Sequence, residues 1–312
     1  MKRDWITRVR MAVFVLALLL CLTASVALAA NATGVSVDGA ILTALNPYWK
    51  NGGGGSASDW NLFFDTSTPT PTLKMKDAVL DTLNPQYYLV LPDGDVIVEL
   101  YGNNSLTYTG ATPGIPVGLG AYGSILIKDG TADKTGSLNV NIHHSSATGL
   151  SAGIMNVNGD ITIDSATVNI TVNDSLMALG IAALNDTYIY GGQTTVSVSG
   201  YEAYGITTEL FQLSGGTIAI TADGTGYGIC ALVFEDTLIT GGYGEFKTVE
   251  DGFGALWRWA SSGTFRVLGG HVIFSAGYSA LIFHTNETLT PDVNGDILVS
   301  EYGSGIDKSI WN

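Results

Sequence analysis

Basic residues, cysteines and prolines are all scarce in this chain. Its 312 residues include 2 cysteines and 8 prolines, and 13 Lys and Arg oppose 28 Asp and Glu, which gives a net charge of −15. This charge excludes nucleic acid as a partner, because nothing would neutralise the phosphates. A bare acidic polysaccharide would also be repelled unless a cation bridged it to the protein.

The chain has one long apolar run, at 11–22, and no later run long enough for a membrane helix. Four basic residues precede this run, and the small-residue stretch 27–29 follows it. This order predicts a secretory signal peptide over 1–29, with an uncleaved anchor as the alternative. We therefore expect a secreted, extracellular protein associated with the cell surface, with no membrane span after cleavage.

Cleavage would make the protein still more acidic. The first 29 residues hold 4 basic and 1 acidic residue, so 9 Lys and Arg would remain against 27 Asp and Glu, a net charge of −18. Cys230 would be the one remaining cysteine, which excludes an intrachain disulfide. An exported chain of this size without disulfides must be held together by a large apolar core.

Two glycine markers recur with one period of about 25 residues. Gly-Ile and its variant return after 27, 25, 23 and 26 residues, and paired glycines return after 24, 26 and 28. Between the markers lie three short segments of alternating apolar residues, which predict strands. The first marker falls at 153–154, 180–181, 205–206, 228–229 and 254–255, and the second at 191–192, 215–216, 241–242 and 269–270.

Three strands per 25-residue unit, without helices, predict an all-β fold: a right-handed parallel β-helix over 85–312. An array of Greek-key domains would not give one period for both markers. Residues 30–84 would cap the first coil and contain a short hairpin, because an open core and bare strand edges invite association. Inward columns are expected at Ile163, Ile189 and Ile239 on the second strand, and at Val168, Val196 and Ile218 on the third.

Aspartates precede the second strand in several coils. Asp160, Asp186 and Asp236 should stack in one column, and Asp95 is a looser match. One interpretation is a turn device, since Asp side chains bond their own backbone. The other is a Ca²⁺ site, because hard oxygen ligands suit this ion and a cation would relieve the repulsion between carboxylates. A second acidic row is expected at Asp174, Asp223, Asp251 and Glu301.

Aromatic residues supply the candidate sugar contacts. Trp257, Arg258 and Trp259 are too large for a regular coil surface, so at least one should break that surface or widen a corner. Tyr243, which follows a glycine pair, is a further candidate carbohydrate contact. Four aromatic residues that precede the first marker are expected to form an internal ladder: Tyr204, Tyr227, Phe253 and Tyr278.

The patterns of known β-helix enzymes are missing. The sequence has no Asp-Asp pair, Gly-His-Gly or Arg-x-Lys motif, and no catalytic residue is assigned. His143 and His144 are adjacent, so on a strand they point to opposite sides and cannot share a metal. Catalysis is therefore not expected, although a polysaccharide lyase or glycoside hydrolase stays open as an alternative.

The stretches NPYWKNG (46–52), LPDGDVIVELYGNNSLT (91–107) and GDITI (159–163) resemble exported bacterial carbohydrate-binding, adhesin-like β-helix proteins with a pectate-lyase-like fold. The resemblance implies a right-handed parallel β-helix, cell-surface placement and glycan binding, in some members with Ca²⁺. We therefore expect a non-catalytic protein that binds a polysaccharide or glycan on a flat strand surface lined with Thr, Asn and Asp. A structural spacer in a surface array is the second alternative.

Overall fold

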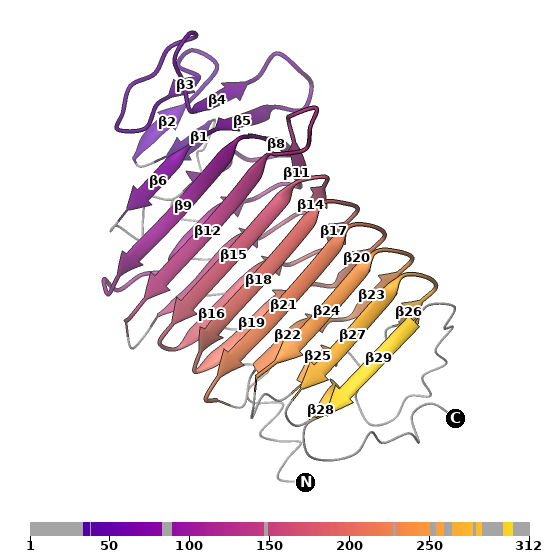
Figure 1. The fold of residues 1–312 in the computed structure, drawn as a ribbon. Coiled ribbons are helices and arrows are strands. Elements are labelled where there is room, and N and C mark those ends of the chain that lie inside the picture. The colour runs from indigo at the N-terminus through magenta and orange to yellow at the C-terminus, as the bar shows by residue number, and fades with distance from the viewer. Residues whose placement is uncertain are drawn as a thin grey trace.

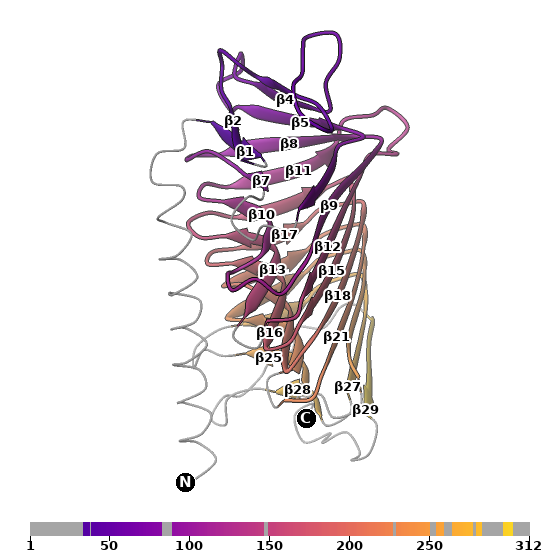
Figure 2. The ribbon, with the colours of Figure 1, turned by 90° about the vertical axis from the view of Figure 1, so that its left-hand side faces the viewer.

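The computed structural model is an all-β parallel solenoid of about 7 turns, which confirms the expected β-helix with three strands per coil. Three sheets run along the solenoid, and each turn adds one strand to each sheet (Figures 1 and 2). Within the described ranges, no helix has the length and apolar character needed to cross a membrane. The structure describes residues 34–37, 39–82, 89–146, 149–226, 229–249, 254–258, 264–276, 279–282 and 296–301.

The strands form three sheets, each a continuous ladder of hydrogen-bonded neighbours. The first sheet runs in the order β2 (Ala40–Leu42), β1 (Val35–Val37), β7 (Leu89–Val90), β10 (Val117–Ala121), β13 (Leu150–Asn156), β16 (Met177–Ala183), β19 (Glu202–Thr207), β22 (Ile229–Phe234), β25 (Gly254–Arg258) and β28 (Ser279–Ile282). The second runs in the order β26 (Phe265–Val267), β23 (Asp236–Ile239), β20 (Leu210–Leu213), β17 (Thr187–Ile189), β14 (Ile161–Asp164), β11 (Ile125–Asp129), β8 (Val96–Tyr101), β5 (Thr72–Lys76), β4 (Leu62–Asp65) and β3 (Tyr48–Trp49). The third runs in the order β29 (Asp296–Glu301), β27 (His271–Ala276), β24 (Tyr243–Thr248), β21 (Thr217–Gly224), β18 (Gln193–Gly200), β15 (Thr167–Asp174), β12 (Ser137–His144), β9 (Asn103–Gly110) and β6 (Val79–Thr82).

Antiparallel pairing is found near the N-terminal end of the solenoid. β1 pairs antiparallel with β2 and β7, and β4 pairs antiparallel with β3 and β5. β5 and β6 also pair in parallel with β8 and β9. Coil-type pairing therefore starts at Thr72, inside the range 30–84 that we assigned to the cap.

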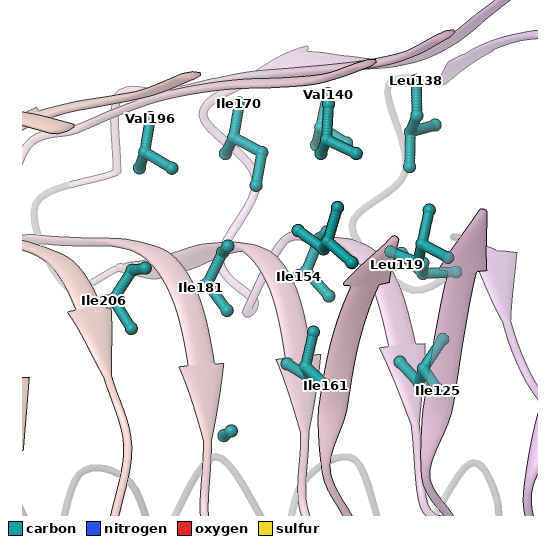
Figure 3. Packing of buried hydrophobic residues seen from close by; sticks show 14 of the residues in the cluster. Leu119, Ile125, Leu138, Val140, Ile154, Ile161, Ile170, Ile181, Val196 and Ile206 are labelled. Atoms are coloured by element: carbon teal, nitrogen blue, oxygen red, sulfur yellow. The ribbon is translucent and has the colours of Figure 1, made fainter. Parts of the chain in front are cut away.

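The inward side chains form vertical columns inside the solenoid. Ile163, Ile189, Leu213 and Ile239 are successive partners in the second sheet, as expected. Figure 3 shows Ile170 and Val196 of the third sheet directed toward Ile181 and Ile206 of the first. All of these side chains are fully buried or nearly so, which gives the continuous core that a chain without disulfides needs.

The column expected on the third strand, Val168, Val196 and Ile218, is wrong at Val196. Val168 aligns with Thr194 and Ile218, whereas Val196 aligns with Ile170 and Ile220. Thr194 takes the inward position although it is polar, and its hydroxyl has no hydrogen-bond partner. Its shape is close to that of valine, so the column stays packed. Because threonine is polar, the sequence pattern did not indicate that Thr194 faces inward in this register.

A column of glycines lets the first and third sheets approach closely. Gly118, Gly153, Gly180 and Gly205 face inward from β10, β13, β16 and β19. A Cβ on Gly180 would lie 2.2 Å from a methyl carbon of Val196 and 2.4 Å from the carbonyl oxygen of Gly205. We call these four residues the glycine column; they explain why Gly-Ile recurs.

The glycine column also corrects the first marker. Ile206 pairs with Leu232, so Ala231 continues the column, and Ile229 of the marker at 228–229 aligns with Ala203 instead. The marker at 254–255 is also out of register, because Gly254 pairs with Cys230. Tyr204 and Gly205 are neighbours, and because Gly205 and Ile206 both face inward, Tyr204 turns to the outer side of the sheet. The expected internal aromatic ladder is therefore wrong for Tyr204, which pairs with Cys230. Its other members, 227, 253 and 278, lie outside the described residues.

The first sheet is apolar on both faces, unlike the other two. Its outer face carries a second cluster of buried side chains, centred on Leu179, Tyr204 and Cys230. β13, β16 and β22 are buried at every position, so their sequences are nearly continuous apolar runs. The alternating pattern expected for this strand is therefore absent there.

The paired glycines form the corner between the second and third sheets. The residues that follow each pair, Gln193, Thr217, Tyr243 and His271, are successive partners, so this marker is confirmed. The second glycine of each pair has φ between +71° and +83°, a left-handed conformation that favours glycine. The corner consequently carries no side chains and stays narrow.

Candidate functional site

The aspartates before the second strand do stack in one column. Asp160 and Asp186 precede paired residues of β14 and β17, and Asp236 follows two coils later with Leu210 between them. Asp160 Oδ1 accepts the N–H of Asp186 at 3.3 Å, and Asp186 Oδ1 accepts that of Leu210 at 3.2 Å. The carboxylates therefore bond the next coil and not their own backbone. The same bond joins Asp95 to Ser124 at 2.9 Å and Asp236 to Thr264.

The predicted calcium site can be tested by thermal unfolding. Among the described residues, no group of three or more His, Cys, Asp and Glu side chains is placed to hold a metal ion. Because the aspartate column already accepts N–H groups from the next coil, we expect the same melting temperature in Ca²⁺ and in EDTA. Melts in Mg²⁺ control for ionic strength. A midpoint raised by Ca²⁺ alone would contradict this expectation.

Asp174 does not belong to an outward acidic row. It lies on the inward side of β15, where its Oδ2 accepts hydrogen bonds from Nδ1 of His144 at 2.9 Å and from the hydroxyl of Ser151 at 2.5 Å. Asp174 aligns with Gly200 and Gly224, whereas Asp223 aligns with Ser199, so the expected row is wrong. Glu301 lies in the column of Ala276 and Thr248, and Asp251 is outside the described residues.

This buried group contains the residue types of a hydrolytic triad in the wrong order. A triad needs histidine between serine and aspartate, but here Asp174 lies between Ser151 and His144. Nε2 of His144 lies 3.2 Å from the carbonyl oxygen of Thr112, so both ring nitrogens are engaged. The side chains of His144 and Asp174 are fully buried, and they tie three coils together. His143 points outward, as expected from its adjacency to His144.

From β9 to β21, the outer face of the third sheet is a regular array of small polar side chains. On β9, β12, β15, β18 and β21, every outward position is Ser, Thr, Asn or Gln except His143, Ala219 and Asp223. We call these outward positions the polar face; Figure 1 looks onto this sheet. Its four files are Asn103–Ser137–Thr167–Gln193–Thr217, Ser105–Asn139–Asn169–Thr195–Ala219, Thr107–Asn141–Thr171–Ser197–Thr221 and Thr109–His143–Asn173–Ser199–Asp223.

Hydrogen bonds between neighbouring strands hold parts of the polar face in place. The Asn169 amide donates to Asn139 Oδ1 at 2.9 Å, and the Ser137 hydroxyl donates to Asn103 Oδ1 at 2.9 Å. Neighbouring strands lie about 4.8 Å apart, and alternate residues along one strand about 6.6 Å. The face therefore presents a grid of mainly uncharged hydroxyl and amide groups, with Asp223 as its one acidic side chain and little freedom to rearrange.

Tyr243 lies at the C-terminal margin of the polar face. It follows Thr217 in the first file and stacks on His271, with ring centroids 5.5 Å apart and 14° between the planes. Trp257 and Arg258 lie on β25 of the first sheet, so the fold separates them from Tyr243. Trp259 lies outside the described residues. Of the candidate sugar contacts that the structure describes, Tyr243 thus lies on a different sheet from Trp257 and Arg258.

Sequence reasoning missed an aromatic pair on the second sheet. Tyr188 and Tyr190 flank the inward Ile189, and their rings stack with centroids 5.7 Å apart. The Tyr188 hydroxyl donates to Asp186 at 2.7 Å; burial, followed by this bond, raises the pKa of Tyr188, so the hydroxyl stays protonated. The alternation in TYIYGG (187–192) could have revealed the pair, because residues two apart share a face.

Polar side chains of the next strand lie beside this pair. Gln212 is the partner of Tyr188, and Ser214 donates its N–H to the Ile189 carbonyl, so it lies beside Tyr190. The Gln212 amide donates to the Ser214 hydroxyl at 2.8 Å, so its amide oxygen remains as an acceptor. We call Tyr188, Tyr190, Gln212 and Ser214 the tyrosine patch.

Comparison with known proteins adds no assignment. No protein-family model, curated protein or solved structure matches this chain.

Proposed function

We propose that this protein is an exported, cell-surface carbohydrate-binding protein of the adhesin type, which holds a glycan without cleaving it. The observation that carries the proposal is the polar face, a grid of hydroxyl and amide groups on strands held rigidly by the coil. Such groups both donate and accept hydrogen bonds, as sugar hydroxyls do. A rigid face binds with less loss of conformational freedom than a mobile loop would.

The charge distribution supports a neutral ligand. The protein has a net charge of −15, whereas the polar face carries Asp223 as its one acidic side chain. The protein as a whole would repel a polyanionic glycan, and a neutral glycan would meet no such barrier on this face. His144 and Asp174 are hydrogen-bonded to each other inside the core. A general base needs a free nitrogen or oxygen within reach of the substrate, so their arrangement supports binding of the glycan over its cleavage.

The proposal is tested by removing hydroxyls from the polar face without changing its shape. The purified protein is screened on a glycan array, and the triple variant Thr171→Val, Thr195→Val and Thr221→Val is compared for the glycans retained. Valine keeps the β-branched shape and removes the hydrogen bonds, so we expect binding to fall about tenfold or more.

Thr194→Val is the matched control, since Thr194 is the inward neighbour of Thr195 and its hydroxyl is buried without a partner. It should leave glycan binding unchanged. Retention of no glycan by the wild-type protein, or equal retention by the triple variant, would contradict the proposal. Release of unsaturated products from pectin would show a lyase instead.

A further inference from the structure

We propose that the tyrosine patch is a second sugar subsite, which binds a neutral hexopyranose through the ring face of Tyr190. The inference rests on the carbohydrate-binding function proposed above and assigns that function a ligand class and a second surface. The ligand class is a neutral glycan of equatorially substituted pyranoses, such as a β-1,4-glucan. Such a ring presents a face of C–H groups, which an aromatic ring can cover.

Tyr190 is placed to make this contact. It is 46% exposed at the position directly after β17, and the ring of Tyr188 stacks beside it. The hydrogen bond from Tyr188 to Asp186 fixes the inner ring, and the inner ring in turn limits the outer one. An aromatic surface that is already oriented loses little freedom on binding, which favours affinity.

The neighbouring polar groups supply hydrogen bonds at the rim of the sugar ring. Gln212 and Ser214 are linked to each other, and the Thr240 hydroxyl lies 3.0 Å from that of Ser214. Asp164, at the end of β14, flanks Tyr190 from the other side, since the Tyr190 N–H bonds the Ile163 carbonyl. Amide, hydroxyl and carboxylate groups therefore lie beside the aromatic ring. Gln212, Thr240 and Asp164 carry oxygens that can accept hydrogen bonds from sugar hydroxyls. The Ser214 hydroxyl already accepts two hydrogen bonds, so it offers a sugar its donor hydrogen.

The two surfaces meet across a corner without side chains. Tyr190 is followed directly by Gly191 and Gly192, and Gln193 then begins β18 on the polar face. The φ of +75° at Gly192 turns the chain there within two residues. One glycan chain can therefore reach from the tyrosine patch to the first file of the polar face.

The test uses cellohexaose as the probe for neutral equatorial pyranoses and a galacturonate hexamer as the anionic comparison, with affinities from calorimetry. We expect cellohexaose to bind and the galacturonate hexamer to bind at least about tenfold more weakly. Tyr190→Ala should weaken cellohexaose binding about tenfold, and Tyr190→Phe should retain it because the ring face is kept.

Tyr201→Ala is the matched control, because Tyr201 is 47% exposed and lies in the turn before β19. The affinity of Tyr201→Ala for cellohexaose should equal that of the wild type, and melting curves would verify that each variant folds. If Tyr190→Ala binds cellohexaose as the wild type does while the valine variants of the polar face lose glycan, the second subsite is wrong and the proposed function stands. If the wild type binds no glycan of either kind or on the array, both proposals are overturned.

Discussion

Replacing Asp174 with alanine should lower the free energy of unfolding by about 3–5 kcal/mol. Asp174 accepts hydrogen bonds from His144, from Ser151 and from the backbone N–H of Leu176 at 2.8 Å. The variant would leave a buried imidazole and a buried hydroxyl without their acceptor, and water cannot reach the site to replace it. Chemical denaturation followed by tryptophan fluorescence would measure the loss.

Asp223→Ala serves as the control for Asp174→Ala. Asp223 is an exposed aspartate near the end of a third-sheet strand, so its removal should change stability by no more than about 0.5 kcal/mol. The His144–Asp174 interpretation fails if the two variants unfold at the same denaturant concentration. The stability of Asp174→Asn should lie between those of the wild type and Asp174→Ala. The asparagine amide keeps one acceptor oxygen, but its NH₂ group replaces the other acceptor and would face a hydrogen-bond donor.

The second large effect is expected at the glycine column. Gly180→Ala should cost about 1–3 kcal/mol, since the added methyl group would meet both Val196 and the carbonyl oxygen of Gly205. A side chain can rotate away, but the carbonyl belongs to the next coil and is fixed by strand pairing. The two sheets would have to separate locally, which lowers the packing of the core. Thermal and chemical unfolding would both report this change.

Gly120 of β10 provides the matched comparison on the same sheet. A Cβ at Gly120 would find its nearest neighbour, a methyl carbon of Val117, at 3.7 Å. Gly120→Ala should therefore leave stability unchanged or raise it by up to about 1 kcal/mol, because alanine lowers the conformational entropy of the unfolded chain. Equal losses at Gly120 and Gly180 would show that close sheet approach is not the reason for the glycine column.

The sequence was sufficient to predict the coil because two of its features report strand pairing directly. The paired glycines mark a corner where the left-handed conformation is required, so their spacing measures the coil. Apolar alternation indicated the second and third strands, and the column from Ile163 to Ile239 followed from both. The stacking of Asp160 on Asp186 followed from the same spacing.

Other parts of the site depend on register, which the sequence does not show. Gly205 and Ile206 both face inward, and this break in alternation moved Tyr204 to the outer side. Thr194 occupies an apolar column although it is polar, so the apolar Val196 two residues later was expected in its place. Asp174 looked like a surface residue because its partners, His144 and Ser151, lie 30 and 23 residues away.

The strand-by-strand construction of the polar face makes its length adjustable. Thr167 pairs with Gln193, so an inserted copy of residues 167–192 would add one coil in register and lengthen the face by about 4.8 Å. Under the function proposed above, a longer protein of this kind would bind long polymers more tightly and short oligomers no more tightly. The number of coils, as much as any one side chain, would then set the length of glycan that the protein prefers.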